Sequence, residues 1–119
     1  IPWRGYFDFI DDVDLFIFHD DLLFTRDWRN RNHIKVGDKV EWVTVPVRFK
    51  HREGTTIEQT LISYDTDWIS SQLNKITAVY RKAPYFDRYF DGFAAHLRAR
   101  PETISVLNIG LIRWVMERL

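Results

Sequence analysis

The sequence predicts an α/β fold, with a mixed sheet in the N-terminal half and three helices in the C-terminal half. Strand-like apolar runs occur before residue 64, and apolar residues recur at helical spacing after residue 67. Hydrophobic residues make up 45 % of the 119 positions, which is enough for a core. The length favours a single domain over residues 1–119, because domains cluster at about 100–150 residues.

The first elements are predicted to be a short helix and a buried strand. Residues 5–12 place Tyr6, Phe9 and Ile10 on one side of a helix, at i, i+3 and i+4. Residues 13–18 form a mostly apolar run, which is typical of a strand covered on both faces. We therefore expect this strand in the interior of the sheet.

A hairpin and one more strand are expected next. Residues 33–36 and 39–47 are strand-like and are separated by the turn pair Gly37-Asp38. Pro46 should mark the end of the second strand or an edge position, because proline cannot donate to the ladder. Residues 56–63 are a further strand candidate after the turn signal Glu53-Gly54.

The second half of the chain carries three apolar stripes at helical spacing. Asp67 is a suitable N-cap for the first stripe, and Pro84 should stop it. The second stripe ends before Pro101. The members of the three stripes are Ile69, Leu73, Ile76 and Tyr80; Phe86, Phe90, Phe93 and Leu97; and Ile104, Leu107, Leu111, Trp114 or Val115, and Leu119.

Composition excludes several classes of protein. The 17 basic and 17 acidic side chains balance, which argues against a general nucleic-acid binder. No apolar run approaches the ~20 residues that a membrane span needs, so we expect none. The absence of cysteine removes disulfides, thiolate zinc sites and cysteine nucleophiles, and it fits a reducing compartment. We expect a cytoplasmic protein, and an oligomer is compatible with these observations.

The balanced charge hides a polarised layout. Between Arg4 and Arg26 every ionised side chain is acidic, whereas from Arg26 to Lys35 only Asp27 is acidic. Neighbouring segments of opposite charge can build a site with a base and an anion anchor. They can equally be two solvated faces.

The first half of the candidate site is His19-Asp20-Asp21, directly after the predicted strand. Ligands of open α/β sheets collect at the carboxyl ends of strands. A carboxylate there can act as a general base or hold a divalent cation, and a histidine can shuttle a proton. Because the two aspartates are adjacent, an extended backbone would point them to opposite sides. The alternative is helix capping or turn formation by Asp20 and Asp21.

The second half of the candidate site runs from Arg26 to Asn32. Arginine holds phosphate or carboxylate with two hydrogen bonds, and asparagine reads hydroxyls or amides. In extended geometry Trp28, Asn30 and Asn32 would share one face, and Arg29 and Arg31 the other. An arginine paired internally with the upstream aspartates is the structural alternative, and RNA binding is a third interpretation.

These residues lead to one site hypothesis. We expect the acids and the basic segment to converge on one pocket, with His19 at its edge. Asp20 or Asp21 would be the general base and Arg26 or Arg31 the phosphate anchor, while Trp28, Asn30 and Asn32 would contact the substrate. No histidine pair has metal-site spacing, so no dedicated metal site is predicted beyond a divalent cation at Asp20 or Asp21.

The sequence resembles the WbqC-like proteins of bacteria over nearly all of its length. The resemblance rests on a set of motifs in this order: Pro2-Trp3 with Gly5-Tyr6-Phe7, the run ending in Asp20-Asp21, Trp28 with Asn30-Arg31-Asn32, Trp42 with Thr44-Val45-Pro46-Val47, Tyr80 with Lys82-Ala83-Pro84, and Leu107-Asn108. The chain departs from the family at Leu23, where many relatives carry a polar residue.

The resemblance implies further expectations. Family members usually begin with a strand upstream of the Pro2 equivalent and run past the Leu119 equivalent, so the chain looks like an ordered fragment of a larger α/β protein. Family genes are commonly found among those for O-antigen and other surface polysaccharides. The resemblance therefore implies a transferase, of acyl or aminoacyl type, acting on a nucleotide-activated or lipid-linked sugar. The alternative is a non-catalytic sugar- or nucleotide-binding or scaffold protein of the same pathway.

Overall fold

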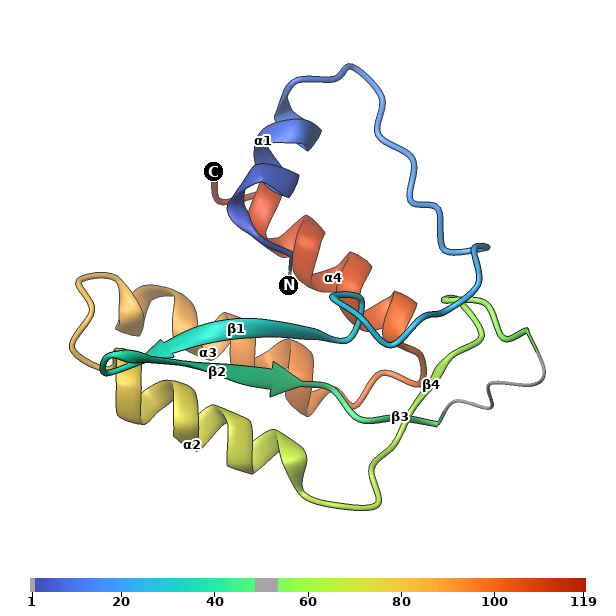
Figure 1. The fold of residues 1–119 in the computed structure, drawn as a ribbon. Helices are drawn as coiled ribbons and strands as arrows, with labels where there is room; N and C mark the ends of the chain where they lie inside the picture. Colours follow the sequence, from blue (N-terminus) through green and yellow to red (C-terminus); the bar gives the residue numbers. More distant parts are fainter. Residues whose placement is uncertain (1, 49–53) are drawn as a thin grey trace.

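The computed structural model describes residues 2–48 and 54–119, and it has the predicted mixed α/β composition (Figure 1). Strands precede the three long helices, and a short helix precedes the strands. The helices are α1 (Arg4–Asp11), α2 (Trp68–Tyr80), α3 (Phe86–Arg98) and α4 (Ile104–Met116). The strands are β1 (Arg31–Val36), β2 (Lys39–Thr44), β3 (Val47–Arg48) and β4 (Leu61–Ile62).

The strands form two small antiparallel sheets, so the expectation of one mixed sheet is wrong. The hairpin β1–β2 is confirmed, with Val36 opposite Lys39 across the turn. Gly37 adopts a φ of +60°, which glycine reaches without steric cost. β2 ends at Thr44, two residues before Pro46, as proline chemistry predicts.

The second sheet is much shorter than the predicted strand over residues 56–63. β4 pairs with β3, and Thr56 makes an isolated bridge to Leu23. Between them the Thr60 N–H donates to the Ile57 carbonyl at 3.2 Å, which turns the chain out of the extended path. Glu53 of the predicted turn lies outside the described residues, and Gly54 follows with a φ of +58°.

The predicted interior strand at residues 13–18 is wrong. Among the described residues, the segment lies outside both sheets, has no paired strand and is not buried on two faces. Leu15 and Ile17 are exposed, whereas Phe16 is half-buried against Tyr6 and Phe9 of α1, and Phe18 is half-buried against Phe16. The apolar run therefore has one covered face instead of two.

The N-cap predicted for the first of the three C-terminal helices is confirmed, and α4 begins at a cap that was not predicted. The Asp67 carboxylate accepts a hydrogen bond from the Ser70 N–H at 3.2 Å and begins α2. In the same way, the Thr103 hydroxyl accepts from the Val106 N–H at 3.3 Å and begins α4. α2 ends at Tyr80, before Pro84.

One core holds the helices and the second sheet together. It contains the buried apolar faces of α2, α3 and α4 together with Phe24 and Ile62. Its buried members are Phe24, Ile62, Trp68, Ile69, Leu73, Ala94, Leu97, Ile104, Leu107 and Leu111. α4 lies between α1 and the hairpin (Figure 1). Its residues line one pocket on the side of α1 and a second on the side of the hairpin.

Polar contacts attach the hairpin to α2. The Lys75 ammonium lies 2.9 Å from the Glu41 carboxylate, and the Gln72 amide donates to the Thr44 carbonyl. The Lys35 N–H donates to the Tyr80 hydroxyl at 3.2 Å. The hairpin is therefore fixed relative to the helices at both of its ends.

Candidate functional site

A tight turn, not an extended strand, presents Trp28 and Arg29. The Asp27 carboxylate accepts hydrogen bonds from the Arg29 N–H at 3.0 Å, from the Arg29 guanidinium and from the Thr25 hydroxyl. Burial alone would raise the pKa of Asp27, but these hydrogen bonds and the charge of Arg29 hold it below its usual value. The extended geometry predicted for residues 28–32, with side chains alternating between two faces, is therefore wrong for residues 28–30. The chain becomes extended only at Arg31, where β1 begins.

The residues after the turn are anchored to the end of β2 and to its tryptophan. The Asn30 amide donates to the Val45 carbonyl at 3.0 Å, and the Val45 N–H donates to the Asn30 carbonyl at 2.7 Å. The Arg31 guanidinium lies 4.4 Å from the ring centre of Trp42. The Asn32 side chain accepts from the His33 N–H at 2.7 Å.

His19 and Asp20 lie outside regular secondary structure, and the chain bends at Asp21. Asp20 is half-buried, and its carboxylate accepts a hydrogen bond from the Ser105 hydroxyl on α4. Asp21 is exposed, and its carboxylate lies 3.4 Å from Nδ1 of the exposed His19. The two adjacent aspartates therefore have different surroundings, although the chain bends at Asp21 instead of continuing as an extended strand.

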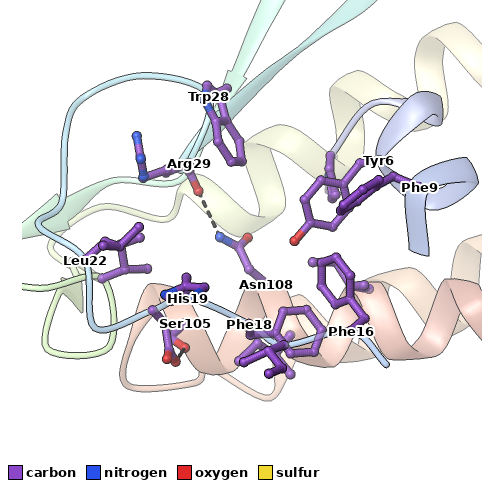
Figure 2. Close-up of a pocket in the computed structure, with 16 residues that line it drawn as sticks. Tyr6, Phe9, Phe16, Phe18, His19, Leu22, Trp28, Arg29, Ser105 and Asn108 are labelled. Carbon is purple, nitrogen blue, oxygen red and sulfur yellow. Dashed lines mark hydrogen bonds between the residues drawn. The ribbon is translucent and has the colours of Figure 1, made fainter. Parts of the chain in front are cut away.

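A first pocket, here called the apolar pocket, lies between α1, α4 and the segment that follows α1. It has a volume of about 320 Å³. Figure 2 shows the hydroxyl of Tyr6 directed into it and Trp28 on the opposite side. Burial raises the pKa of Tyr6. Its apolar walls include Phe9, Phe16, Phe18, Ile109 and Ile112, and its polar lining residues include His19, Asp20 and Ser105.

A second pocket, here called the polar pocket, lies between the hairpin, α2 and α4. It has a volume of about 270 Å³ and is lined by Asn30, Arg31, Asn32, His33 and Gln72, among others. Three consecutive residues of its wall have a buried polar atom without a hydrogen-bond partner among the described residues: Arg29 Nε, Asn30 Oδ1 and Arg31 Nε. Such atoms are uncommon in folded proteins, and each requires a physical explanation.

The two pockets share one wall. Pro2, Trp28, Arg29 and Asn108 line both of them. The Asn108 amide donates to the Arg29 carbonyl at 2.9 Å, a contact between residues 79 positions apart (Figure 2). This hydrogen bond fixes the turn that carries Trp28 onto α4.

The predicted site residues are therefore divided between two adjoining pockets instead of one. His19, Asp20 and Trp28 line the apolar pocket, and Trp28, Asn30, Arg31 and Asn32 line the polar pocket. Asp21 and Arg26 line neither. Arg29 pairs with Asp27 and not with the upstream acids. That these residues bind or catalyse stays a prediction.

Sequence reasoning assigned no site role to Tyr6, Ser105 or Asn108. For Ser105 and Asn108, the sequence does contain a signal, which is a polar residue within the apolar stripe of a helix. Ser105 is buried, and Asn108 directly follows the buried Leu107. Among the residues that the structure describes, no group of three or more His, Asp or Glu side chains could hold a metal ion. Likewise, no helix in residues 2–48 and 54–119 has the length and apolar character to cross a bilayer.

The protein thus has a mixed α/β fold with two adjoining pockets, which together form a candidate small-molecule site. The apolar pocket has the volume of small-molecule sites, which begin at about 300 Å³. Over residues 1–119 the chain matches the WbqC-like protein family, and it belongs to that family.

One relative is a Mycobacterium tuberculosis protein whose own name is "Uncharacterized protein Rv1507c". It is 41 % identical over 121 residues, which is 100 % of this chain and 52 % of the relative. The chain thus spans about half the length of this curated relative. No solved structure matches the chain.

Proposed function

We propose that the protein is a cytoplasmic transferase that adds an acyl or aminoacyl group to an activated sugar, nucleotide-activated or lipid-linked, during assembly of bacterial O-antigen or another surface polysaccharide. The observation that carries the proposal is the pair of unlike pockets joined by Trp28, Arg29 and Asn108. An acyl group suits the apolar pocket, and a sugar with its phosphate suits the polar one. Membership of the WbqC-like family supports the pathway.

The polar pocket would hold the sugar. Hydroxyl groups both donate and accept, so they complement the two arginine Nε donors and the Asn30 Oδ1 acceptor that lack partners. These atoms are covered by protein, so the side chains must turn for a ligand to reach them. Relief of an unpaired buried group is worth about 1–3 kcal/mol, which would favour that movement on binding.

The apolar pocket would hold the group being transferred, with Asp20 as the general base. Asp20 lines this pocket and Asp21 does not, so the structure favours Asp20 between the two candidates. The carboxylate would take the proton from the acceptor hydroxyl or amine as that group attacks the acyl carbonyl, and the bond between the acyl group and its donor would then break, with the donor leaving with the electron pair and the proton. The Ser105 hydroxyl would hold the carboxylate in place, and His19 would lie at the rim.

The binding half of the proposal is tested with Arg31→Ala. Loss of a charged hydrogen bond to phosphate should weaken binding of a uridine diphosphate sugar by about tenfold to a hundredfold in calorimetric titration. Arg98→Ala is the matched control, since Arg98 is exposed on α3 and lines neither pocket. An Arg31→Ala protein that melts several degrees early yet binds normally when folded would contradict the assignment.

A non-catalytic binding or scaffold protein is the second candidate. It is favoured by the internal pairing of the charged groups, since Arg29 is held by Asp27 and Asp20 by Ser105. Asp20→Asn separates the two functions, because the amide keeps the shape but cannot accept a proton. For a transferase the substitution spares binding and depresses turnover.

A deletion strain gives an independent answer. Surface polysaccharide that lacks one substituent supports the transferase. Loss of the whole polymer, with no turnover in vitro, supports the scaffold. Mass spectrometry of ligand that co-purifies with the full-length protein would identify the sugar and the transferred group.

A further inference from the structure

The segment that joins α1 to Asp20 is extended but unpaired. No backbone hydrogen bond connects any residue from Val13 to His19 with another residue in the part of the chain that the structure describes. Pairing begins immediately afterwards. The Glu58 N–H donates to the Asp20 carbonyl at 2.9 Å, and the Ile57 N–H donates to the Leu22 carbonyl at 2.9 Å. Figure 1 shows the segment arching away from α1 before it reaches this paired part.

The side chains of the segment alternate as those of a β-strand do. Leu15 and Ile17 are 75 % and 66 % exposed. Phe16 and Phe18 are half-buried, with ring centres 5.2 Å apart, and Phe16 packs 5.6 Å from Tyr6. A period of two residues is the mark of a strand, so the inner face is already fixed in register. What the segment lacks is a neighbour for its backbone and a cover for its outer face.

We propose that residues 13–19 pair as a β-strand with a strand from the part of the family protein that lies outside these 119 residues. Unpaired strand edges with apolar side chains bind a further strand readily, through backbone hydrogen bonds and alternate side-chain contacts. The occupant is available, because 48 % of the curated relative's length lies beyond the region it shares with this chain. The run is also apolar enough for a strand covered on both faces.

The charges of the segment disfavour a second copy of this chain as the occupant. An antiparallel pair centred on Phe16 would bring Asp12 opposite Asp20 at the ends of the segment. A parallel pair in register would place each Asp14 beside its copy. Like charges directly opposite each other destabilise strand pairing. The added strand is therefore expected to be apolar and free of acidic residues at its ends.

Strand addition would also affect the apolar pocket. Phe16 and Phe18 line that pocket from the inner face of the segment. If an added strand pairs with residues 13–19, the rings of Phe16 and Phe18 stay in place. If the segment stays unpaired, this wall of the apolar pocket is free to move. The inference does not depend on the proposed transferase activity.

Hydrogen exchange on the full-length protein tests the proposal directly. The amides of residues 14–19 that donate to the added strand, which are every second one along the segment, should exchange at least about 100-fold more slowly than unpaired peptide, because a paired strand must open before it exchanges. Amides of β2 are the internal reference, since they are paired within the hairpin. Exchange of residues 14–19 at the rate of free peptide in the full-length protein would overturn the proposal. So would protection that depends on protein concentration, because that result would indicate a second copy.

Leu15→Lys gives a second readout on the same full-length protein. An added strand would place its own apolar side chains beside Leu15 on the outer face, so a lysine at this position should lower the melting temperature by several degrees and reduce protection over residues 14–19. Val40→Lys is the matched control, because Val40 is 65 % exposed on β2 and outside the segment. A Leu15→Lys protein that melts and exchanges like wild type would show that nothing covers this face.

Discussion

Single polar side chains tie together segments that lie far apart in the chain. The Asn108 amide holds the Arg29 carbonyl, and the Tyr64 hydroxyl donates to the Pro101 carbonyl at 2.7 Å. Each contact satisfies a backbone carbonyl that lies outside regular secondary structure. Asn108 is the contact on which both pockets depend, because it fixes the turn that they share.

Asn108→Ala should therefore lower the free energy of unfolding by about 1–3 kcal/mol, the cost of leaving a covered carbonyl without a partner. Urea denaturation measures it. Asn74→Ala is the control, since Asn74 is exposed on α2 and alanine favours helix, so its stability should be unchanged or slightly higher. Equal unfolding free energies for Asn108→Ala and wild type would show that the contact contributes nothing.

The sequence predicts contacts between residues that lie close together in the chain, but not contacts between residues that lie far apart. Asp67 was predicted as a cap, and Thr103 could have been, because the partner of each lies three residues away. Thr25, Asp27 and Arg29 are equally local, and this spacing could have predicted a turn in place of the extended segment at residues 28–30. The pairing of Asn108 with Arg29 crosses 79 positions, and no local pattern encodes it.

The helices of the second half approach closely enough that one glycine is required. A Cβ at Gly92 on α3 would lie 2.7 Å from the Trp114 ring on α4. That ring is held by an edge contact with Tyr89 and by Arg118, whose guanidinium lies 4.6 Å from the ring centre. Gly110 on α4 differs, because its Cβ would meet His96 at 3.5 Å, an ordinary contact.

Gly92→Ala and Gly110→Ala should therefore change stability in opposite directions. Alanine favours a helix over glycine by about 1 kcal/mol at both sites, so Gly110→Ala should raise the melting temperature. At Gly92 overpacking typically costs about 1–3 kcal/mol, which outweighs that gain and should lower it. Differential scanning calorimetry of both variants decides, and a stabilised Gly92→Ala protein would mean that Trp114 moves aside easily.

The helices were predictable as elements, and the sheet was not. Apolar stripes, caps and prolines located α2, α3 and α4 closely, because helices are built from local contacts. The hairpin was also local, with its turn at Gly37. Residues 13–18 have the side-chain pattern of a buried strand, but pairing depends on a neighbour that the pattern does not supply. The single expected sheet therefore became two small ones.

The chain has equal numbers of acidic and basic side chains, but the stability of the fold depends on pH because several carboxylates have shifted pKa values. Hydrogen bonds from Ser63 and Arg48 hold the pKa of Asp65 below its usual value, and hydrogen bonds from Ser70 do the same for Asp67. Asp27 is shifted in the same direction by Thr25 and Arg29, against the effect of burial. Asp65 and Asp67 lie directly before α2, and Asp27 lies in the turn that carries Trp28, so acid should weaken both of these parts of the fold.

The sign of the effect follows from these lowered pKa values. A carboxylate with a lower pKa in the folded state contributes stability above its unfolded pKa, near 3.8, and this is lost as pH falls through the folded pKa. The free energy of unfolding should therefore be level above about pH 5 and fall below about pH 4.

Asp27→Asn keeps an oxygen for the Arg29 N–H but loses the charge that pairs with the guanidinium. The variant should be less stable than wild type at pH 7, and the difference should shrink as pH falls below 4, because wild-type Asp27 then becomes neutral as well. Urea denaturation at a series of pH values from 7 to 2 measures both curves. A difference between the two proteins that stays constant down to the lowest pH would mean that the Asp27 charge stabilises nothing, and that the turn at Trp28 depends on hydrogen-bond shape alone.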